Sequence, residues 1–290
     1  MSLDKRIKLK NGVEMPVIGL GTSLRGKPNK VDNQQFIDSI KHALNIGYRH
    51  IDTAKAYNNE NLIGQAIKES SVDRKEIFLV TKLFPDDMGF EKTLKAFEKS
   101  CKQLQVDYVD LYLIHFPGKP NKPDAQLEKS RQLRLDSWKA LEKLYNDGKC
   151  RAIGVSNFMK RHLEELLEAG MSLPMINQCE FHPYYNNKDL WDYCNQIGVQ
   201  FEGYSPLGKG NLLNDDVVLS LAQKYSKTPA QILLNWCLRN NVITVPGSTN
   251  LERLEENFNV FDFSLSDSDV DLLWNLNKNE KVSWDPTNVV

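Results

Sequence analysis

The sequence has 290 residues and a formal net charge of -1, with 37 Lys and Arg against 38 Asp and Glu. Because both signs are mixed along the chain, these numbers argue against a nucleic-acid-binding surface, which needs a concentrated basic face. No apolar run reaches the ~20 residues of a membrane helix, and the five cysteines are dispersed without a C-x-x-C pair. We therefore expect a cytoplasmic protein with reduced thiols, no metal site, and neither membrane nor nucleic acid as partner.

The chain begins with a hairpin pattern and continues as short apolar segments that alternate with helical patterns. Apolar and polar residues alternate from Ile7 to Met15 around Asn11-Gly12, a strong hairpin signal. Several of the later segments are apolar almost throughout, as parallel strands covered on both faces should be. The eight predicted strands are Val17–Leu20, Arg49–Thr53, Phe78–Thr81, Leu111–Ile114, Ala152–Val155, Ile176–Cys179, Gln200–Tyr204 and Val242–Val245.

The segments between these strands have the periodicity of helices. Thr228 and Pro229 begin a capping box with proline at the first helical position. Eight strand–helix units predict an α/β fold, a single (β/α)8 TIM barrel domain over residues 1–290 with an N-terminal β-hairpin. Two apolar stripes at helical spacing are Leu94, Phe97, Cys101 and Leu104, and Leu135, Trp138, Leu141 and Tyr145, the second ending near Gly148 as a C-cap.

A doubly wound nucleotide-binding fold is the alternative architecture. Gly19 and Gly21 form a G-x-G pair, but the third glycine of the phosphate loop is missing. No acidic residue closes a second strand about 20 residues later, as that fold requires. The barrel is therefore the favoured fold, and in such barrels the chemistry takes place in the loops that follow the strands. Pro117–Pro123 is predicted to be a long loop of this kind after the fourth strand.

Four polar side chains follow consecutive strands. Asp52 ends the second strand and Tyr57 follows five residues later, while Lys82 and His115 come directly after the third and fourth strands. Taken singly, each has an ordinary structural interpretation: a loop cap, a surface aromatic, a solvated lysine or a core histidine. Because neighbouring strands end at the same rim of a barrel, we expect the four side chains to lie together.

Together these side chains suit the reduction of a carbonyl group. Such a reduction needs a proton for the developing alkoxide, and a free tyrosine, with a pKa of about 10, is a weak donor at neutral pH. A nearby ammonium lowers that pKa, so Lys82 would make Tyr57 a better general acid. Asp52 would keep Lys82 charged, and His115 would hydrogen-bond and orient the substrate oxygen.

The chain resembles the aldo-keto reductases over nearly its whole length. The stretches that carry the resemblance are Gly47–Ala54, Leu111–Pro117 and Gly148–Phe158. The family's catalytic aspartate, tyrosine, lysine and histidine match Asp52, Tyr57, Lys82 and His115, all unchanged. The resemblance implies a (β/α)8 fold and NADPH-dependent reduction of aldehydes or ketones to alcohols, with cofactor binding before substrate.

The resemblance also implies which residues bind the cofactor and the substrate. The positions that match cofactor contacts are Gly21, Thr22, Asp52, Ser156, Asn157, Gln178, Tyr204, Ser205, Pro206, Leu207, Gly208, Pro246, Ser248, Thr249, Asn250, Arg253, Glu256 and Asn257. Relatives often have tryptophan at several pocket positions where this chain does not, so we expect a wide, apolar pocket. The pocket positions are Ser23, Tyr57, Phe84, His115, Phe116 and Trp284, the last of which is equally well interpreted as a surface aromatic.

One cofactor position departs from the family pattern. In most NADPH-using relatives a lysine that grips the 2′-phosphate stands at the position of Gly247. Ser248 and Arg253 match two other phosphate contacts, and a guanidinium can bind phosphate through two parallel hydrogen bonds. We therefore expect NADPH to be preferred over NADH, by a smaller margin than in the relatives that have the lysine.

Two other functional classes use similar features. A cofactor-binding structural or regulatory protein can share the fold without turnover, but the intact set of four residues argues against it. A short-chain type of dehydrogenase uses the same chemistry, but its tyrosine and lysine lie about a helix turn apart rather than on separate strands. We expect a monomer that reduces a small carbonyl compound, whose identity the sequence does not report.

Overall fold

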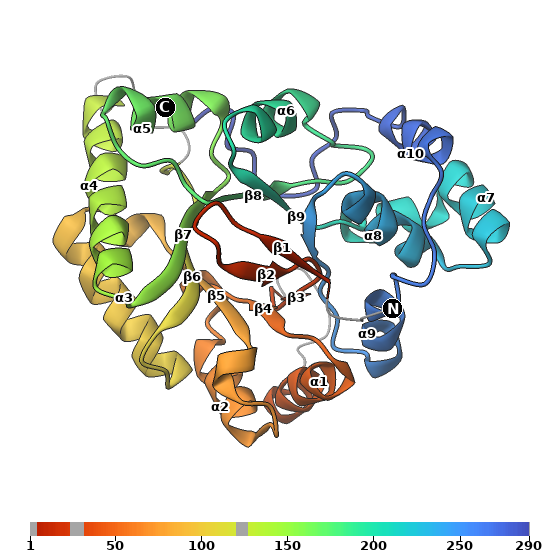
Figure 1. The fold of residues 1–290 in the computed structure, drawn as a ribbon, viewed down its shortest axis with the longest axis horizontal. Coiled ribbons are helices and arrows are strands. Elements are labelled where there is room, and N and C mark those ends of the chain that lie inside the picture. The colour runs from red at the N-terminus through yellow and green to blue at the C-terminus, as the bar shows by residue number, and fades with distance from the viewer. Residues whose placement is uncertain (1–4, 24–31, 120–126, 290) are drawn as a thin grey trace.

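The structure, a computed structural model, describes residues 5–23, 32–119 and 127–289. Eight parallel strands form one sheet, which closes because Ile18 pairs with Thr244 and the Gly19 amide donates to the Thr244 carbonyl at 2.9 Å. The result is the expected (β/α)8 barrel, with the strands at its centre (Figure 1). In chain order the strands are β3 (Leu20–Gly21), β4 (His50–Asp52), β5 (Phe78–Leu83), β6 (Val109–Ile114), β7 (Cys150–Ser156), β8 (Ile176–Glu180), β9 (Gln200–Tyr204) and β10 (Ile243–Val245).

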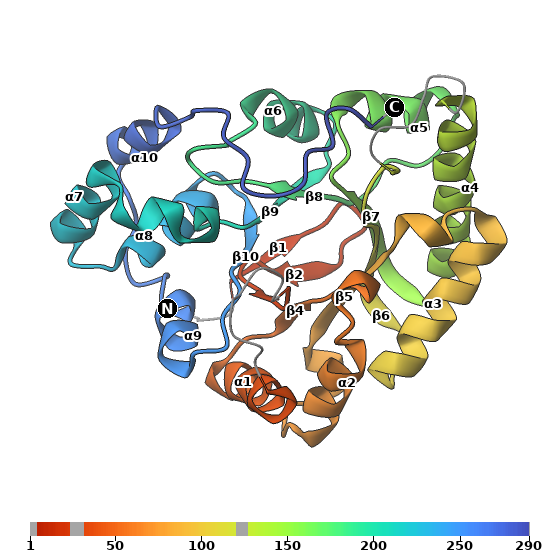
Figure 2. The same ribbon diagram turned by 180° about the vertical axis from the view of Figure 1, so that it is seen from behind.

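Helices surround the barrel and cover the outer faces of its strands (Figures 1 and 2). The predicted apolar stripes are confirmed, since Phe97 in the helix Phe90–Leu104 and Trp138 in the helix Leu127–Asn146 are buried. The predicted capping box is also confirmed, with Thr228 in front of the helix Pro229–Arg239. None of the helices in the described ranges is both long and apolar enough to cross a membrane. The helices are α1 (Asn33–Ile46), α2 (Glu60–Glu69), α3 (Phe90–Leu104), α4 (Leu127–Asn146), α5 (Lys160–Glu168), α6 (Lys188–Gln196), α7 (Asp216–Tyr225), α8 (Pro229–Arg239), α9 (Leu251–Phe258) and α10 (Asp267–Trp274).

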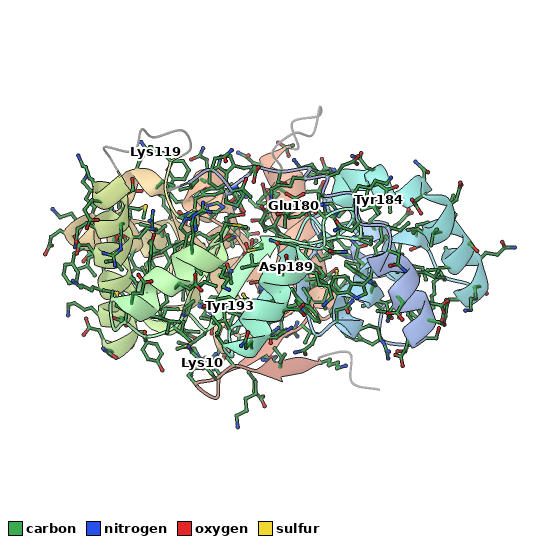
Figure 3. The ribbon with its side chains drawn as sticks, turned by 90° about the horizontal axis from the view of Figure 1, so that it is seen from above. Lys10, Lys119, Glu180, Tyr184, Asp189 and Tyr193 are labelled. Atoms are coloured by element: carbon green, nitrogen blue, oxygen red, sulfur yellow. The ribbon has the colours of Figure 1, made fainter. Side chains whose placement is uncertain are left out.

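An antiparallel hairpin covers one end of the barrel. Its turn is at Asn11-Gly12, as expected, and Gly12 has the positive φ of 86° that favours glycine. The Asn11 side chain donates to the Arg151 carbonyl at 2.9 Å, at the amino end of β7. Figure 3 shows Lys10 of the hairpin at this end and Glu180 nearer the other. The carboxyl ends of the strands therefore lie on the side away from β1 (Arg6–Lys8) and β2 (Glu14–Pro16).

The first barrel strand differs from the sequence prediction. Instead of Val17–Leu20, β3 comprises Leu20–Gly21, and Ile18 makes only an isolated bridge. Val17 is shared between the hairpin and the barrel, because its amide donates to the Lys5 carbonyl and its carbonyl accepts from the Thr244 amide, each at 3.0 Å. The other strands occur where predicted, with ends shifted by one or two residues. The predicted loop Pro117–Pro123 lies partly outside the described residues.

Two glycines face each other where the barrel closes. The Gly21 amide donates to the Pro246 carbonyl at 3.0 Å. A Cβ at position 21 would lie 2.5 Å from the Val245 carbonyl oxygen, and one on Gly247 would lie 2.8 Å from the Gly21 carbonyl oxygen. Neither position can accept a side chain unless the backbone moves. The close approach of β3 and β10 therefore depends on glycine at both positions.

We predict that Gly21→Ala destabilises the fold. Forcing an extra methyl group into a tightly packed site costs about 1–3 kcal/mol of unfolding free energy, and the atom it meets here is backbone rather than a movable side chain. Denaturant unfolding would measure the change. Gly118→Ala is a suitable control, because its Cβ would meet side-chain atoms and no backbone, with Val289 at 3.1 Å and Arg134 at 4.0 Å. Equal stability of the two variants would contradict the argument.

Candidate active site

A buried ion pair lies at the carboxyl ends of β4 and β5. The Lys82 Nζ is 2.6 and 2.7 Å from the two carboxylate oxygens of Asp52, and it donates a further bond of 3.0 Å to the Thr53 carbonyl. The Lys82 side chain has no exposed surface. These three bonds satisfy the three donors of an ammonium group, so the lysine is held inside the barrel as a cation.

The charge of this pair follows from its surroundings. Burial disfavours the Lys82 ammonium, but the negative charge of Asp52, with smaller effects from Tyr57 and Glu202, outweighs it and raises the pKa of Lys82. The Gln178 side chain, from β8, donates to the Asp52 carboxylate at 2.8 Å. The carboxylate is therefore bound from two sides and Lys82 stays charged at neutral pH.

Tyr57 lies above the ion pair on a short helical turn. Its ring centre is 5.2 Å from the Lys82 Nζ and 5.6 Å from the His115 ring, which it meets edge-on. The side chain of Asn59 supports this turn, because it accepts from the Thr53 hydroxyl at 2.8 Å and donates to the Thr22 carbonyl at 2.9 Å. The structure thus brings together the four side chains that the sequence analysis singled out.

Aromatic side chains extend from His115 along the rim. The Phe116 ring stacks on His115 with 4.2 Å between ring centres, and Trp284 meets Phe116 edge-on at 4.6 Å. Trp284 is half-buried and packs against Phe116, another of the predicted pocket positions. Of the other pocket positions, Phe84 is half-buried and Ser23 is exposed. Phe116 and Trp284 thus continue the row of rings that begins at His115, and we call these three side chains the aromatic wall.

Asn157 joins the aromatic wall to the next part of the rim. Its amide nitrogen donates to the His115 carbonyl and the Ser156 hydroxyl, each at 3.0 Å, and its oxygen accepts from the Tyr204 hydroxyl at 2.8 Å. The residue has a φ of 62°, in the left-handed region that asparagine tolerates better than most residues. These contacts hold Tyr204 by its hydroxyl and leave its ring partly exposed.

The start of α9 offers groups that suit an anion. Asn250 caps the helix by accepting from the Arg253 amide at 2.9 Å, and the Ser248 hydroxyl accepts from the Asn250 amide at 3.1 Å. The Arg253 side chain is exposed and makes no ion pair with any residue of the described ranges. Of the other predicted cofactor positions in this helix, Glu256 already accepts from the Thr228 hydroxyl at 2.6 Å, and Asn257 is buried.

The remaining predicted cofactor positions follow the carboxyl ends of strands on the same rim, and their role stays a prediction. Within the described residues, no group of three or more His, Cys, Asp or Glu side chains is arranged to hold a metal ion. The cofactor positions concerned are Gly21 at the end of β3 and Thr22 directly after it, Ser205, Pro206, Leu207 and Gly208 after β9, and Pro246 and Thr249 after β10.

The sequence did not predict that Glu180 holds the C-terminal segment in place through hydrogen bonds, a contact that we call the clasp. The Glu180 carboxylate, at the end of β8, accepts from the Val282 and Ser283 amides at 2.6 and 3.1 Å and from His182 at 3.0 Å. Burial opposes the charged form of Glu180, but the His182 and backbone bonds and the charge of Lys281 lower its pKa. An acidic residue at the end of a strand was the same signal that identified Asp52.

The chain matches the family model described as the aldo/keto reductase family over residues 17–278. It belongs to the aldo/keto reductase family. Among curated members, it is 48% identical to the glyoxal reductase of Bacillus subtilis over 98% of this chain and 97% of that protein. It is 41% identical to the 9,11-endoperoxide prostaglandin H2 reductase of Trypanosoma cruzi over 97% of this chain and 95% of that protein.

Solved aldo-keto reductases share the fold closely. One from a Medee basin deep-sea metagenome library has a TM-score of 0.88 and 41% identity, covering 98% of this chain and 99% of that one. An aldo-keto reductase of Bombyx mori in complex with NADP has a TM-score of 0.89 and 32% identity, covering 98% and 96%. The chain is therefore an oxidoreductase of this family, with the barrel that its members share.

We predict that Glu180→Ala releases the C-terminal segment. Hydrogen bonds to a charged group contribute about 1.5–3 kcal/mol each, so loss of the Val282 and Ser283 bonds should increase local opening by at least ~10-fold. Trypsin cleavage after Lys281 would measure it under native conditions. Glu280→Gln is the matched control, since that side chain is exposed and makes no bond to the described residues. Equal cleavage rates in both variants would rule out the clasp.

Proposed function

We propose that this aldo/keto reductase uses NADPH to reduce aldehydes or ketones to alcohols, with Tyr57 as the general acid. The observation that supports it most is the arrangement of Tyr57 and His115 beside the buried Asp52–Lys82 pair. A cation within 5.2 Å of the phenol ring favours the ionised form of a tyrosine and so strengthens it as an acid. The reductase names and the NADP complex of similar proteins agree with the proposal.

The rim has groups that fit a nicotinamide dinucleotide, which would supply the hydride. The partly exposed ring of Tyr204 provides a stacking surface, and Ser156, Asn157 and Gln178 provide polar groups for a carboxamide. The bonds of Asn157 leave its oxygen with capacity for one more hydrogen bond. At the other end, Arg253 and the amides that begin α9 suit a phosphate.

The protein's own groups account for the proton. Tyr57 would donate its hydroxyl proton to the substrate oxygen as negative charge develops there. Lys82, held as a cation by Asp52, stabilises the phenolate that remains. His115 directs the substrate oxygen toward Tyr57, and the packed rings of Phe116 and Trp284 exclude water from one side.

The aromatic wall favours a small carbonyl compound attached to an apolar group, and Ser23, a further predicted pocket position, is exposed. We also propose that the protein works in the cytoplasm as a monomer. The five cysteines are all free thiols and all buried, which agrees with a reducing compartment.

The alternative is a protein that binds the cofactor but has lost turnover. The Lys82 Nζ lies 2.6 and 2.7 Å from the carboxylate oxygens of Asp52, and Tyr57 is next to this pair. A purely structural role does not require this arrangement. NADPH oxidation with a generic aromatic aldehyde distinguishes the two proposals directly. Cofactor binding without any turnover over a panel of carbonyl compounds would favour the alternative.

We predict that Tyr57→Phe lowers kcat by at least ~100-fold, the usual effect of removing a general acid. Cofactor affinity, measured by fluorescence quenching, should remain nearly unchanged, because the hydroxyl is not proposed to contact the cofactor. Lys82→Met should behave similarly. The control is Tyr193→Phe, which removes a hydroxyl on α6, far from the rim (Figure 3). A Tyr57→Phe enzyme with most of the wild-type kcat would refute this assignment.

We predict that wild-type protein prefers NADPH and that Arg253→Ala nearly abolishes the preference. A hydrogen bond to a charged group contributes about 1.5–3 kcal/mol, a factor of at least ~10 in relative kcat/KM. The control is Arg131→Ala, an arginine on α4. Gly247→Lys, which the sequence suggests as a gain of preference, is a poorer test because its Cβ would lie 2.8 Å from the Gly21 carbonyl. A wild-type preference for NADH would show that no 2′-phosphate site operates.

A further inference from the structure

Two ionisable side chains face each other inside the barrel, and the proposed reaction does not use them. They are His50 of β4 and Glu202 of β9, both without exposed surface, with 3.6 Å between the His50 Nε2 and the Glu202 Oε1. Neither nitrogen of His50 and neither carboxylate oxygen of Glu202 has a hydrogen-bond partner of normal geometry among the described residues. Burial of ionisable groups without well-formed hydrogen bonds costs free energy, so their presence calls for an explanation.

The barrel makes room for this pair and places it next to the catalytic residues. A Cβ at Gly19 would lie 2.4 Å from the His50 Nδ1, so the histidine ring occupies space that only a glycine leaves. His50 and Asp52 are two residues apart in β4, so their side chains point to the same side of the strand. Glu202 pairs in register with Gln178, the residue that donates to the Asp52 carboxylate.

The surrounding charges determine the protonation of the pair. Burial, and next the charge of Asp52, raise the pKa of Glu202 to about 8, against smaller opposing effects of Lys82 and the Gln178 amide. Burial lowers the pKa of His50 to about 4; Asp52, the Pro16 carbonyl and Asp110 oppose this, while Lys82 adds to it. At neutral pH both side chains are uncharged, and Glu202 carries a proton.

We propose that Glu202, with His50 as its neighbour, is a positioning residue that holds one titratable proton next to the Asp52–Lys82 pair and thereby sets how far into the alkaline range Tyr57 remains a proton donor. The proposal rests on the proposed function of Tyr57. Neither Glu202 nor His50 touches the reacting atoms; both act through the ion pair.

The proposed effect has a definite direction. Loss of the proton to solvent converts the Glu202 carboxylic acid into a carboxylate and adds a negative charge near Lys82. That charge offsets part of the field that the ammonium exerts on Tyr57, and the phenol therefore keeps its proton to higher pH. Wild-type protein should then retain reductase activity at alkaline pH, where a protein without this carboxylate loses it.

The first test is the pH profile of Glu202→Gln, which keeps the shape and removes the titration. We expect the kcat/KM plateau for carbonyl reduction below pH 7 to stay within ~2-fold of wild type, and its alkaline limb to move down by about half to one pH unit, as one added charge produces at protein distances. Glu60→Gln is the matched control, because Glu60 is buried and has a raised pKa but bonds to Thr81 instead. A limb at the same pH in wild type and Glu202→Gln would overturn the proposal, and a lowered plateau with an unmoved limb would indicate a merely structural role.

Two measurements do not depend on turnover. Infrared spectra of wild type minus Glu202→Gln should contain the carbonyl band of a protonated carboxylic acid at neutral pH, and the band should disappear as Glu202 ionises.

Because the folded pKa of Glu202 is raised from 4.5 to about 8, its contribution to stability is present below pH 4.5 and is lost between those values. The Tm of wild type should therefore fall relative to Glu202→Gln across that range.

The outcomes separate the two proposals. Absence of the band at neutral pH, together with parallel Tm profiles, would show that Glu202 is already ionised and would overturn this inference while leaving Tyr57 as the acid. If instead Tyr57→Phe stays active, the proposed function fails even though the band and the Tm difference are present. His50→Gln gives an internal check, since removing the neighbouring ring should shift the pH at which the Glu202 band disappears.

Discussion

The ion pair of Asp52 and Lys82 is the interaction on which the rest of the site depends. An ammonium inside a barrel is stable only if a carboxylate compensates it and every donor is satisfied, which the bonds to Asp52 and Thr53 achieve. Loss of one partner of such a pair typically costs about 3–5 kcal/mol, because the other charge is left buried. The Gln178 side chain donates to Asp52, and the Tyr57 ring lies 5.2 Å from the Lys82 Nζ, so the function that we propose depends on the charge state of this pair.

Two residues connect the substrate side of the rim to the rest. Asn157 bonds to the His115 carbonyl and the Tyr204 hydroxyl, so the orientation of the proposed substrate-binding histidine and of the proposed stacking ring are linked through one amide. Glu180 holds the backbone just before Trp284, which closes the aromatic wall. Both residues act through hydrogen bonds to partners far away in the sequence, and residue type alone does not identify those partners.

Much of the fold and the four central residues could be predicted from the sequence. The patterns that predicted the fold depend only on residues that are near one another in the sequence, so they can be recognised without the tertiary structure. They are the apolar strand segments, the hairpin turn at Asn11-Gly12, the capping box at Thr228, and the helical stripe of Leu94, Phe97, Cys101 and Leu104. The position of Asp52, Lys82 and His115 at strand ends was sufficient to place them on one rim, because parallel strands in a barrel share their direction. The predicted start of the first strand was wrong because Val17 bonds both to Lys5 of the hairpin and to Thr244 of the barrel, and local sequence does not encode such a shared position.

Only the tertiary structure decided which distant residues meet. Glu202 lies in an ordinary strand segment, and nothing in that segment indicates that its carboxyl group faces His50 across the barrel at 3.6 Å. Trp284 was equally well interpreted as a surface residue until its contact with Phe116 was seen. The sequence by itself determined the elements and the chemistry available at their ends. Closure of the barrel decided the cross-barrel contacts, because pairing across a closed sheet depends on the register of all eight strands at once.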